Sequence, residues 1–271
     1  MGDAHHASPA GGVRGRDTAV YVACSTLSFT KLSLEDALRT VREMRFTKAD
    51  LAIHDGGPHL TPAEVVEDGA RAAQRLKAAN LPLATIHLVT THDPAEARGQ
   101  FRAVCRLARV STVPVVTIPA APLGSDLDAE VERLQDWVRI GETEGIILTV
   151  ETHADTVTAD PFGAAELCRR VPGLALTLDP SHYHIGPHSK GEYDYLYKFV
   201  RHVRLRDTGK TQDQFQVRIG QGELEYGKIL SQLDRVRYDR ALTVDVRDVP
   251  DNSFPIEPEV RKLKYLLESL V

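Results

Sequence analysis

Four short apolar segments in the second half of the chain each end at a side chain that can bind a metal or move a proton. These residues are Glu151, Asp179, Arg204 and Asp245, and a helical pattern follows before the next apolar segment. Alternating apolar runs and helices predict parallel strands, whose carboxyl ends meet at one rim of a sheet. Three carboxylates and a guanidinium at one rim would interact strongly, so we expect a cation or a polar substrate there.

Glu151, Asp179 and His182 are the candidates with the clearest chemistry. Glu151 follows an apolar run, where a carboxylate can bind a hard cation or act as a base; the alternative is an exposed loop glutamate. In Asp179-Pro-Ser-His182 the carboxylate can hold a metal while the imidazole holds or protonates a substrate oxygen. The alternative for this segment is a capped turn, because Asp-Pro and Ser also form turns.

Arg204 lies in a segment where residues 202, 204 and 206 alternate with apolar residues and therefore share one strand face. If that face points into a barrel, His202 lies deep and Arg204 lies near the rim. There Arg204 could clamp a carboxylate or phosphate of a substrate through two hydrogen bonds. It could equally form an internal salt bridge with Asp179 or Asp245, and the sequence does not separate these two hypotheses.

Two histidines and a glycine-rich turn complete the candidate site. His54 and His87 end two successive strand-like segments at equivalent positions, which favours a role in lining a pocket. Gly220-Gln-Gly222 could let the backbone approach a ligand, although a tight turn explains the two glycines equally well.

Strand and helix signals alternate eight times along the chain. Helix starts are marked by Ser33, by Thr61-Pro62-Ala63-Glu64 with its capping-box glutamate, and by Asp93-Pro94 and Asp160-Pro161. No GxGxxG motif follows the first strand, which argues against a dinucleotide-binding fold. Eight units in 271 residues predict an α/β fold, a single-domain (β/α)8 TIM barrel over residues 19–271, after a disordered tail at residues 1–18. The expected strands lie near 19–26, 48–54, 82–88, 113–119, 146–151, 174–179, 201–206 and 240–246.

Composition limits the partners that the chain is expected to bind. Lys and Arg total 33 against 38 Asp and Glu, so the formal charge of −5 provides no basic surface for nucleic acid or an anionic membrane. No apolar run approaches the ~18 residues of a membrane span. The three cysteines form no CxxC pair and are expected to be buried thiols of a cytoplasmic protein. A small sugar or polyol remains the expected partner, and a homo-oligomer stays open.

The pattern resembles the xylose isomerase-like TIM barrels, a superfamily of sugar and sugar-phosphate isomerases and epimerases that also includes endonuclease IV. The resemblance covers residues 19–271. It rests on Glu151 after the fifth strand, on Asp179 and His182 as a D-x-x-H motif, on Asp207-Thr208 after the seventh strand, and on the turn at Gly220-Gln-Gly222.

Carried over residue by residue, the resemblance implies a divalent-metal site that is incomplete in this chain. The ketose 3-epimerases hold one cation with Glu, Asp, His and Glu. Glu151 and Asp179 match the first two ligands, Asp245 is a shorter fourth ligand, and Arg204 stands where the histidine is expected. A guanidinium would repel the cation, whereas three carboxylates would attract Mn, Mg, Co or Zn, so the presence of a metal stays open.

The resemblance also implies which residues contact the substrate. The arginine that the epimerases place four residues before the GxG turn is Gln216 here, which leaves nearby Arg218 as a substrate-binding candidate together with His54, His87, His182 and Arg204.

The implied activity is that of a sugar or sugar-phosphate isomerase or epimerase that abstracts a proton next to a carbonyl. Glu151 or Asp245 would be the base and His182 would contact the substrate; a lyase acting on an oxidised sugar needs the same groups. One alternative is a non-catalytic, sugar-binding barrel with a degenerate metal site. A nuclease like endonuclease IV is less favoured, because that enzyme needs three zinc ions and many more histidines.

Overall fold

The computed structural model describes residues 20–186, 192–250 and 252–271. The tail expected at residues 1–18 lies outside these described residues.

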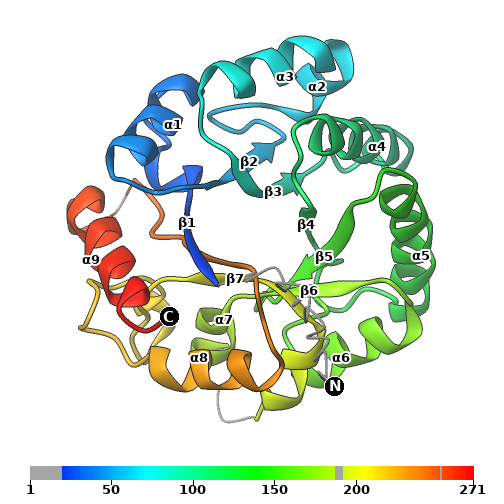
Figure 1. The fold of residues 1–271 in the computed structure, drawn as a ribbon. Coiled ribbons are helices and arrows are strands. Elements are labelled where there is room, and N and C mark those ends of the chain that lie inside the picture. Colours follow the sequence, from blue (N-terminus) through cyan, green and yellow to red (C-terminus); the bar gives the residue numbers. More distant parts are fainter. Residues whose placement is uncertain (1–19, 187–191, 251) are drawn as a thin grey trace, which may run out of the picture.

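The described residues form a closed barrel of eight parallel strands in which each strand pairs with the next and β8 pairs with β1 (Figure 1). This confirms the predicted (β/α)8 TIM barrel, and each strand lies within two residues of its predicted limits. The strands are β1 (Tyr21–Ser25), β2 (Ala49–His54), β3 (Leu83–Val89), β4 (Val115–Pro119), β5 (Ile147–Glu151), β6 (Ala175–Leu178), β7 (Val200–Leu205) and β8 (Ala241–Val244).

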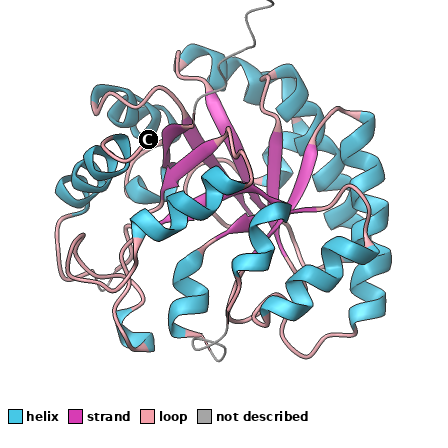
Figure 2. Cartoon of the chain, turned by 60° about the horizontal axis from the view of Figure 1, so that its bottom comes forward, coloured by secondary structure: helices cyan, strands magenta, loops and turns pink. Residues whose placement is uncertain are grey.

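The α-helices lie outside the ring of strands, as Figure 2 shows. They are α1 (Leu34–Glu43), α2 (Pro62–Glu67), α3 (Gly69–Ala78), α4 (Pro94–Val110), α5 (Leu127–Thr143), α6 (Pro161–Arg170), α7 (Pro180–Ile185), α8 (Tyr226–Arg235) and α9 (Ile256–Glu268). Among the helices of the described ranges, none has the length and apolar character needed to cross a lipid bilayer.

The predicted helix starts are confirmed by the hydrogen bonds at the helix N-termini. The side chain of Ser33 accepts from the backbone of α1, and Asp93 and Asp160 do the same for α4 and α6. At α2 the complete capping box is present, because Thr61 accepts from the Glu64 backbone N–H and Glu64 accepts from that of Thr61. These caps satisfy N–H groups that have no partner within the helix.

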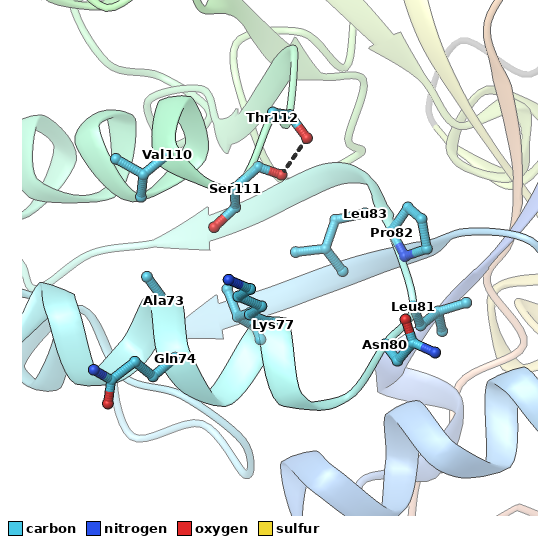
Figure 3. A pocket seen from close by; sticks show the side chains of 11 residues that line it. Ala73, Gln74, Lys77, Asn80, Leu81, Pro82, Leu83, Val110, Ser111 and Thr112 are labelled. Carbon is cyan, nitrogen blue, oxygen red and sulfur yellow. Dashed lines mark hydrogen bonds between the residues drawn. The ribbon is translucent and has the colours of Figure 1, made fainter.

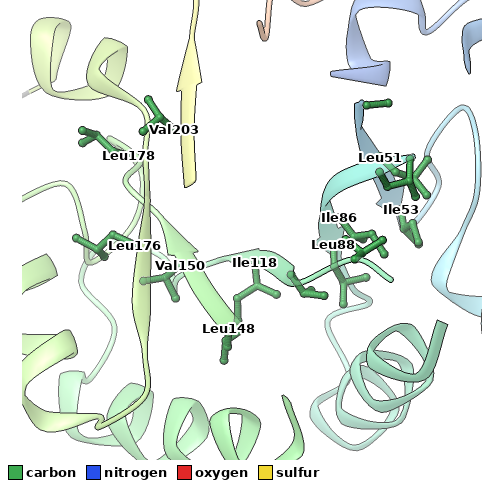
Figure 4. Close-up of a cluster of buried hydrophobic side chains, with 14 of the residues drawn as sticks. Leu51, Ile53, Ile86, Leu88, Ile118, Leu148, Val150, Leu176, Leu178 and Val203 are labelled. Carbon is green, nitrogen blue, oxygen red and sulfur yellow. The ribbon is translucent and has the colours of Figure 1, made fainter. Parts of the chain in front are cut away.

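The strands separate apolar from polar residues across the barrel wall. One set of alternating side chains points outward toward the helices and forms the apolar core, including Leu51, Ile86, Leu148 and Val203 (Figure 4). The other set points into the barrel, and it is largely polar because the strand repeat places every second residue on the same face. The outward-facing apolar side chains of the strands therefore stabilise the packing of helices against strands, and the polar side chains face the interior of the barrel.

A layer of buried hydroxyl groups lies across the interior of the barrel. The Oγ1 atoms of Thr117, Thr149 and Thr177 lie 2.8 to 2.9 Å from one another. His202 continues this layer, with its ring nitrogens 3.3 Å from the Thr177 Oγ1 atom and 2.8 Å from the Thr243 Oγ1 atom. Hydrogen bonding between these groups offsets the cost of burying them. His202 therefore belongs to this layer.

The glycine-rich turn after β7 is held by Asp207. Its Oδ2 atom accepts the backbone N–H groups of Gly220 and Gly222, at 2.7 and 3.0 Å. A Cβ atom on Gly222 would lie 2.1 Å from the Asp207 Oδ1 atom, and Gly220 has a φ of +84°. The structure therefore gives both glycines and Asp207 a role in closing the loop before α8.

We expect Gly222→Ala to lower the free energy of unfolding by about 1–3 kcal/mol, because the added methyl group overlaps the Asp207 carboxylate. Gly227→Ala, in α8, is the matched control, because its Cβ meets nothing within 4 Å. That change should be neutral or stabilise the protein by up to about 1 kcal/mol. Urea denaturation of both variants measures the difference, and equal stabilities would contradict the proposed close approach.

Candidate active site

The four strand-end residues singled out in the sequence lie together at the carboxyl end of the barrel. Glu151 is the last residue of β5, Asp179 and Asp245 directly follow β6 and β8, and Arg204 lies in β7. All four side chains are buried, and the contacts described below join them into one cluster.

Arg204 pairs with a carboxylate that the sequence reasoning missed. Its Nε and Nη2 atoms donate to the Oδ2 atom of Asp50, at 3.0 and 2.7 Å, and its Nη1 atom donates to the Oε1 atom of Glu151 at 3.2 Å. Its side chain has no exposed surface. Arg204 therefore does form an internal salt bridge, but with Asp50 and Glu151, so the predicted partners Asp179 and Asp245 were wrong. The hypothesis that Arg204 clamps a substrate also finds no support, because Asp50 on β2 occupies that side of the guanidinium.

A second buried arginine, Arg206, joins Asp179 to Asp245. Its Nη1 atom lies 2.7 Å from the Asp179 Oδ2 atom, and its Nη2 atom donates to the Asp245 Oδ2 atom at 2.5 Å. Asp179 also caps α7, since its Oδ1 atom accepts the Ser181 N–H. The capped-turn interpretation is thus confirmed, and the same carboxylate pairs with Arg206 through its other oxygen.

A third arginine, Arg247, approaches the cluster from the loop after β8. Its Nε atom donates to the Asp245 Oδ2 atom at 3.0 Å, and its Nη2 atom lies 3.8 Å from the Glu151 Oε1 atom. Its side chain is 26% exposed, whereas Arg204 and Arg206 are fully buried. Arg247 is therefore the one arginine of these three whose side chain is partly exposed, although its Nη2 atom is buried.

The sequence contained a signal for each residue that was missed. Asp50 lies on the same face of β2 as Ala52 and His54. Arg206 shares a face with Arg204, and Arg247 follows Asp245 by two residues. The period of two marks all of them as inward-facing candidates. The pairing between strands on opposite sides of the barrel, in contrast, depends on its closure.

The three guanidiniums keep the buried carboxylates ionised. Burial alone would raise the pKa of Glu151, but Arg204 and then His87 more than reverse this, so its pKa lies well below the usual value. Burial also raises the pKa of Asp50, but Arg204 more than offsets this. Burial raises the pKa of Asp245 in the same way, and Arg247 and Arg206 more than offset it, so both pKa values lie below the ordinary range. These carboxylates are therefore charged at neutral pH.

His182 presents a free N–H group at the site. Burial lowers its pKa to about 4, so the imidazole is neutral at pH 7. Its Nδ1 atom accepts the N–H of Ala154 at 3.3 Å, which places the proton on Nε2. The Nε2 atom lies 3.7 Å from the Asp179 Oδ2 atom and has no hydrogen-bond partner within the described residues. This N–H can therefore donate to a substrate oxygen.

His54 and His87 support Glu151 from the side of β2 and β3. The His87 Nδ1 atom accepts from Arg204 Nη1 at 2.8 Å and lies 3.1 Å from His54 Nε2, so its own proton belongs on Nε2. That Nε2 atom lies 3.3 Å from the Glu151 Oε2 atom. Burial lowers the pKa of His54 to about 2 and also lowers the pKa of His87, so both rings are neutral. His87 therefore lies against Glu151, and His54 contacts the ring of His87.

The structure does not bring Arg218 into this cluster. Its exposed side chain lies 3.9 Å from Glu259 and above the ring of Phe254, on the side of α9. Gln216 lies closer, because it exchanges two hydrogen bonds with the backbone of Arg247. Since Ile219 lies buried next to Arg218 in the chain, the loop directs the Arg218 side chain away from the barrel mouth.

The donors at this end of the barrel do not fit a divalent cation. Across residues 20–186, 192–250 and 252–271, no group of three or more His, Cys, Asp or Glu side chains could hold a metal ion. Arg204 stands at the expected histidine position, and Arg206 lies against both Asp179 and Asp245. At an effective dielectric constant near 20, a dication about 4 Å from one guanidinium would be opposed by about 8 kcal/mol. The three carboxylates expected to bind a metal therefore form ion pairs with arginines instead: Glu151 with Arg204, and Asp179 and Asp245 with Arg206.

A separate hollow lies at the opposite end of the barrel, where the strands begin. It has a volume of about 380 Å³ and lies between the end of α3, the start of β3 and the end of α4 (Figure 3). Lys77 is the single charged side chain among the residues that line it. A single lysine provides no acid–base pair, so the chemistry is assigned to the carboxyl end.

The buried neutral histidines predict a loss of stability in mild acid. Below pH 6.5 the unfolded chain binds protons at His54, His87, His182 and His202, whereas the folded pKa values are lowered, to about 4 for His182 and His202. Unfolding then takes up protons, so the free energy of unfolding falls as the pH drops from 6.5 toward 4. Each group contributes about 1.4 kcal/mol per pH unit. Below the ordinary carboxyl pKa the paired carboxylates add to this loss.

Urea denaturation at a series of pH values between about 7.5 and about 5, a range that includes the histidine pKa of the unfolded chain, measures how the free energy of unfolding changes with pH. His182→Asn should lower this slope by the contribution of one proton, about 1.4 kcal/mol per pH unit. A stability that stays constant over that interval would show that the histidines have the same pKa values in the folded protein as in the unfolded chain.

Comparison with known proteins agrees with the observed fold. No curated protein matches the chain in sequence. Among solved structures, a D-allulose 3-epimerase from Methylomonas sp. superposes with a TM-score of 0.74 at 14% identity, covering 93% of this chain and 98% of that chain. A probable 3-DHS dehydratase from Bacillus anthracis gives 0.70 at 14% identity, with 92% and 98% covered. A Mycobacterium smegmatis protein in complex with magnesium gives 0.71 at 15% identity, with 93% and 98% covered.

These identities are low, and the structural likeness shows the fold alone. The family is identified by sequence, because the family model for xylose isomerase-like TIM barrels matches residues 38–268. The chain therefore belongs to the xylose isomerase-like TIM barrel family.

Proposed function

We propose that the protein is an isomerase- or epimerase-type enzyme that removes a proton next to the carbonyl group of a small keto sugar. Membership of the family and the fold shared with a sugar epimerase support this proposal. The observation that carries it is the presence of three complementary groups at one end of the barrel. They are the ionised Glu151, the free N–H of His182 and the partly exposed Arg247.

In this mechanism Glu151 accepts the proton, and the electrons of the C–H bond pass into an enediolate. The neutral His182 donates its Nε2–H to the carbonyl oxygen, and Arg247 stabilises the negative charge that develops there. Glu151, which now carries the proton, returns it to the neighbouring carbon and so completes an isomerisation. In an epimerisation Asp245, which is ionised at rest, first takes up a proton from solvent and then delivers it to the opposite face of the same carbon. The lowered pKa makes Glu151 a weak base, so the donors must stabilise the enediolate strongly.

The charge of the cluster favours an uncharged sugar over a sugar phosphate. Asp50, Glu151, Asp179 and Asp245 face the guanidiniums of Arg204, Arg206 and Arg247, and with neutral histidines this leaves one net negative charge. A phosphate group would meet this charge and would have to compete with carboxylates for each guanidinium.

A non-catalytic, sugar-binding barrel is the second candidate. It is favoured by one observation, the pairing of both Asp179 and Asp245 with Arg206, which restrains the catalytic candidate Asp245. A lyase acting on an oxidised sugar would begin with the same proton abstraction as an isomerase and differs from it in its products.

The proposed proton abstraction is tested by incubating the protein with a panel of unphosphorylated ketoses in D2O. Deuterium should appear at the carbon next to the carbonyl, detected by NMR. Glu151→Gln should reduce this exchange by at least about a hundredfold, because the amide is not a base. Glu257→Gln, an exposed glutamate on α9, is the matched control and should keep the wild-type rate.

Exchange at the wild-type rate in Glu151→Gln would contradict the role of Glu151. Binding of a ketose without any exchange in the wild-type protein would favour the non-catalytic barrel. Product analysis of an exchanging substrate separates an isomerase or epimerase from a lyase.

The charge argument predicts tighter binding of neutral ketoses than of their phosphate esters. We expect the free sugar to bind at least about tenfold more tightly, corresponding to about 1.4 kcal/mol. Isothermal titration with matched pairs of a ketose and its phosphate measures this. Tighter binding of the phosphate would show that Arg247 leaves Asp245 to bind an anion.

A further inference from the structure

Arg206 lies where one positive charge joins two carboxylates from different strands. Its two terminal nitrogens contact the Oδ2 atoms of Asp179 after β6 and Asp245 after β8, at 2.7 and 2.5 Å. All three side chains have no exposed surface. Two buried carboxylates that share one central cation form the arrangement that a metal ion commonly creates, and here the cation is part of the chain.

The position of this guanidinium is fixed from several sides. Its Nε atom donates to the backbone oxygen of Asp245 at 3.2 Å, and the ring of Phe215 lies 4.6 Å from the guanidinium carbon. The hydroxyl group of Tyr226 donates to the backbone oxygen of Arg206. A side chain held in this way cannot swing out to admit a metal ion without breaking several contacts, and each move would leave buried carboxylates without a partner.

We propose that Arg206 takes the place of a divalent cation in this barrel, so that the centre is built with a permanent guanidinium and binds no divalent metal between Asp179 and Asp245. The inference concerns the charge that organises the site. Metal binding is measured without substrate, so the result does not depend on whether the proposed reaction is correct.

Arg206, more than Arg204, excludes the metal. Arg204 replaces a histidine expected from the family, but its guanidinium pairs with Asp50 and Glu151 and lies away from the bridge between Asp179 and Asp245. Replacing Arg204 by histidine would leave this bridge intact. Replacing Arg206 by glutamine, in contrast, removes the guanidinium that lies between Asp179 and Asp245. The two buried carboxylates then attract a dication to that position.

The test is a titration of MnCl2 into metal-free protein, followed by calorimetry and by the change in Tm. The wild-type protein and Arg204→His should show no stoichiometric binding and no rise in Tm. Arg206→Gln should bind one Mn²⁺ per chain at least about tenfold more tightly than the wild type, with a Tm that rises with MnCl2 concentration. Arg206→Lys, which keeps the charge, and the distant Arg218→Gln should behave as the wild type.

Adding Asp179→Asn to Arg206→Gln should abolish the gained binding, which locates the metal at the bridge. If Arg206→Gln does not fold in plain buffer, its refolding yield with and without MnCl2 gives the same information. A higher yield with MnCl2 supports the proposal, and equal yields contradict it. The proposal is overturned if the wild-type protein binds one Mn²⁺ per chain and Asp179→Asn removes it, or if folded Arg206→Gln gains no affinity.

Discussion

The pairing of buried carboxylates with buried guanidiniums is the interaction on which the carboxyl end of this barrel depends. Asp50, Glu151, Asp179 and Asp245 come from four strands and would destabilise the fold if they were buried without counterions. Arg204, Arg206 and Arg247 satisfy them in a chain of contacts that crosses the barrel. Removal of one arginine from such a network typically costs 3–5 kcal/mol, roughly, because a buried charge is left without a partner. The site is therefore a structural element as well as a candidate active site.

The histidines and threonines extend this network without adding charge. His54 and His87 remain neutral, and His87 directs one N–H toward Glu151, while His202 and four threonines fill the interior with hydrogen bonds. Neutral imidazoles suit this environment, because a protonated ring would lie beside a guanidinium. His182 keeps an Nε2–H without a hydrogen-bond partner in the described structure, and it lies at the carboxyl end of the barrel. The network thus leaves a small number of groups free for a ligand.

The family relationship and the residue chemistry lead to different expectations about metal. Membership of the xylose isomerase-like barrels explains the fold, and one structural relative was solved in complex with magnesium. In this chain the carboxylates at the carboxyl end of the barrel face guanidiniums, which supply positive charge of fixed position. A guanidinium can stabilise an oxyanion by charge and by directed hydrogen bonds, so the loss of a metal site does not by itself imply the loss of a function.

The sequence by itself determined the architecture and the end of the barrel where polar side chains gather. Eight apolar runs separated by capped helices predict parallel strands, and the residues that end these runs must lie at one rim, as Glu151, Asp179 and Asp245 do. Only the tertiary structure decided the partners. Asp50 and Arg204 are 154 positions apart, and their contact arises because barrel closure brings β2 and β7 face to face across the interior. Local patterns determine which way a side chain points, whereas charge pairing depends on distances across the closed barrel, which no local pattern contains.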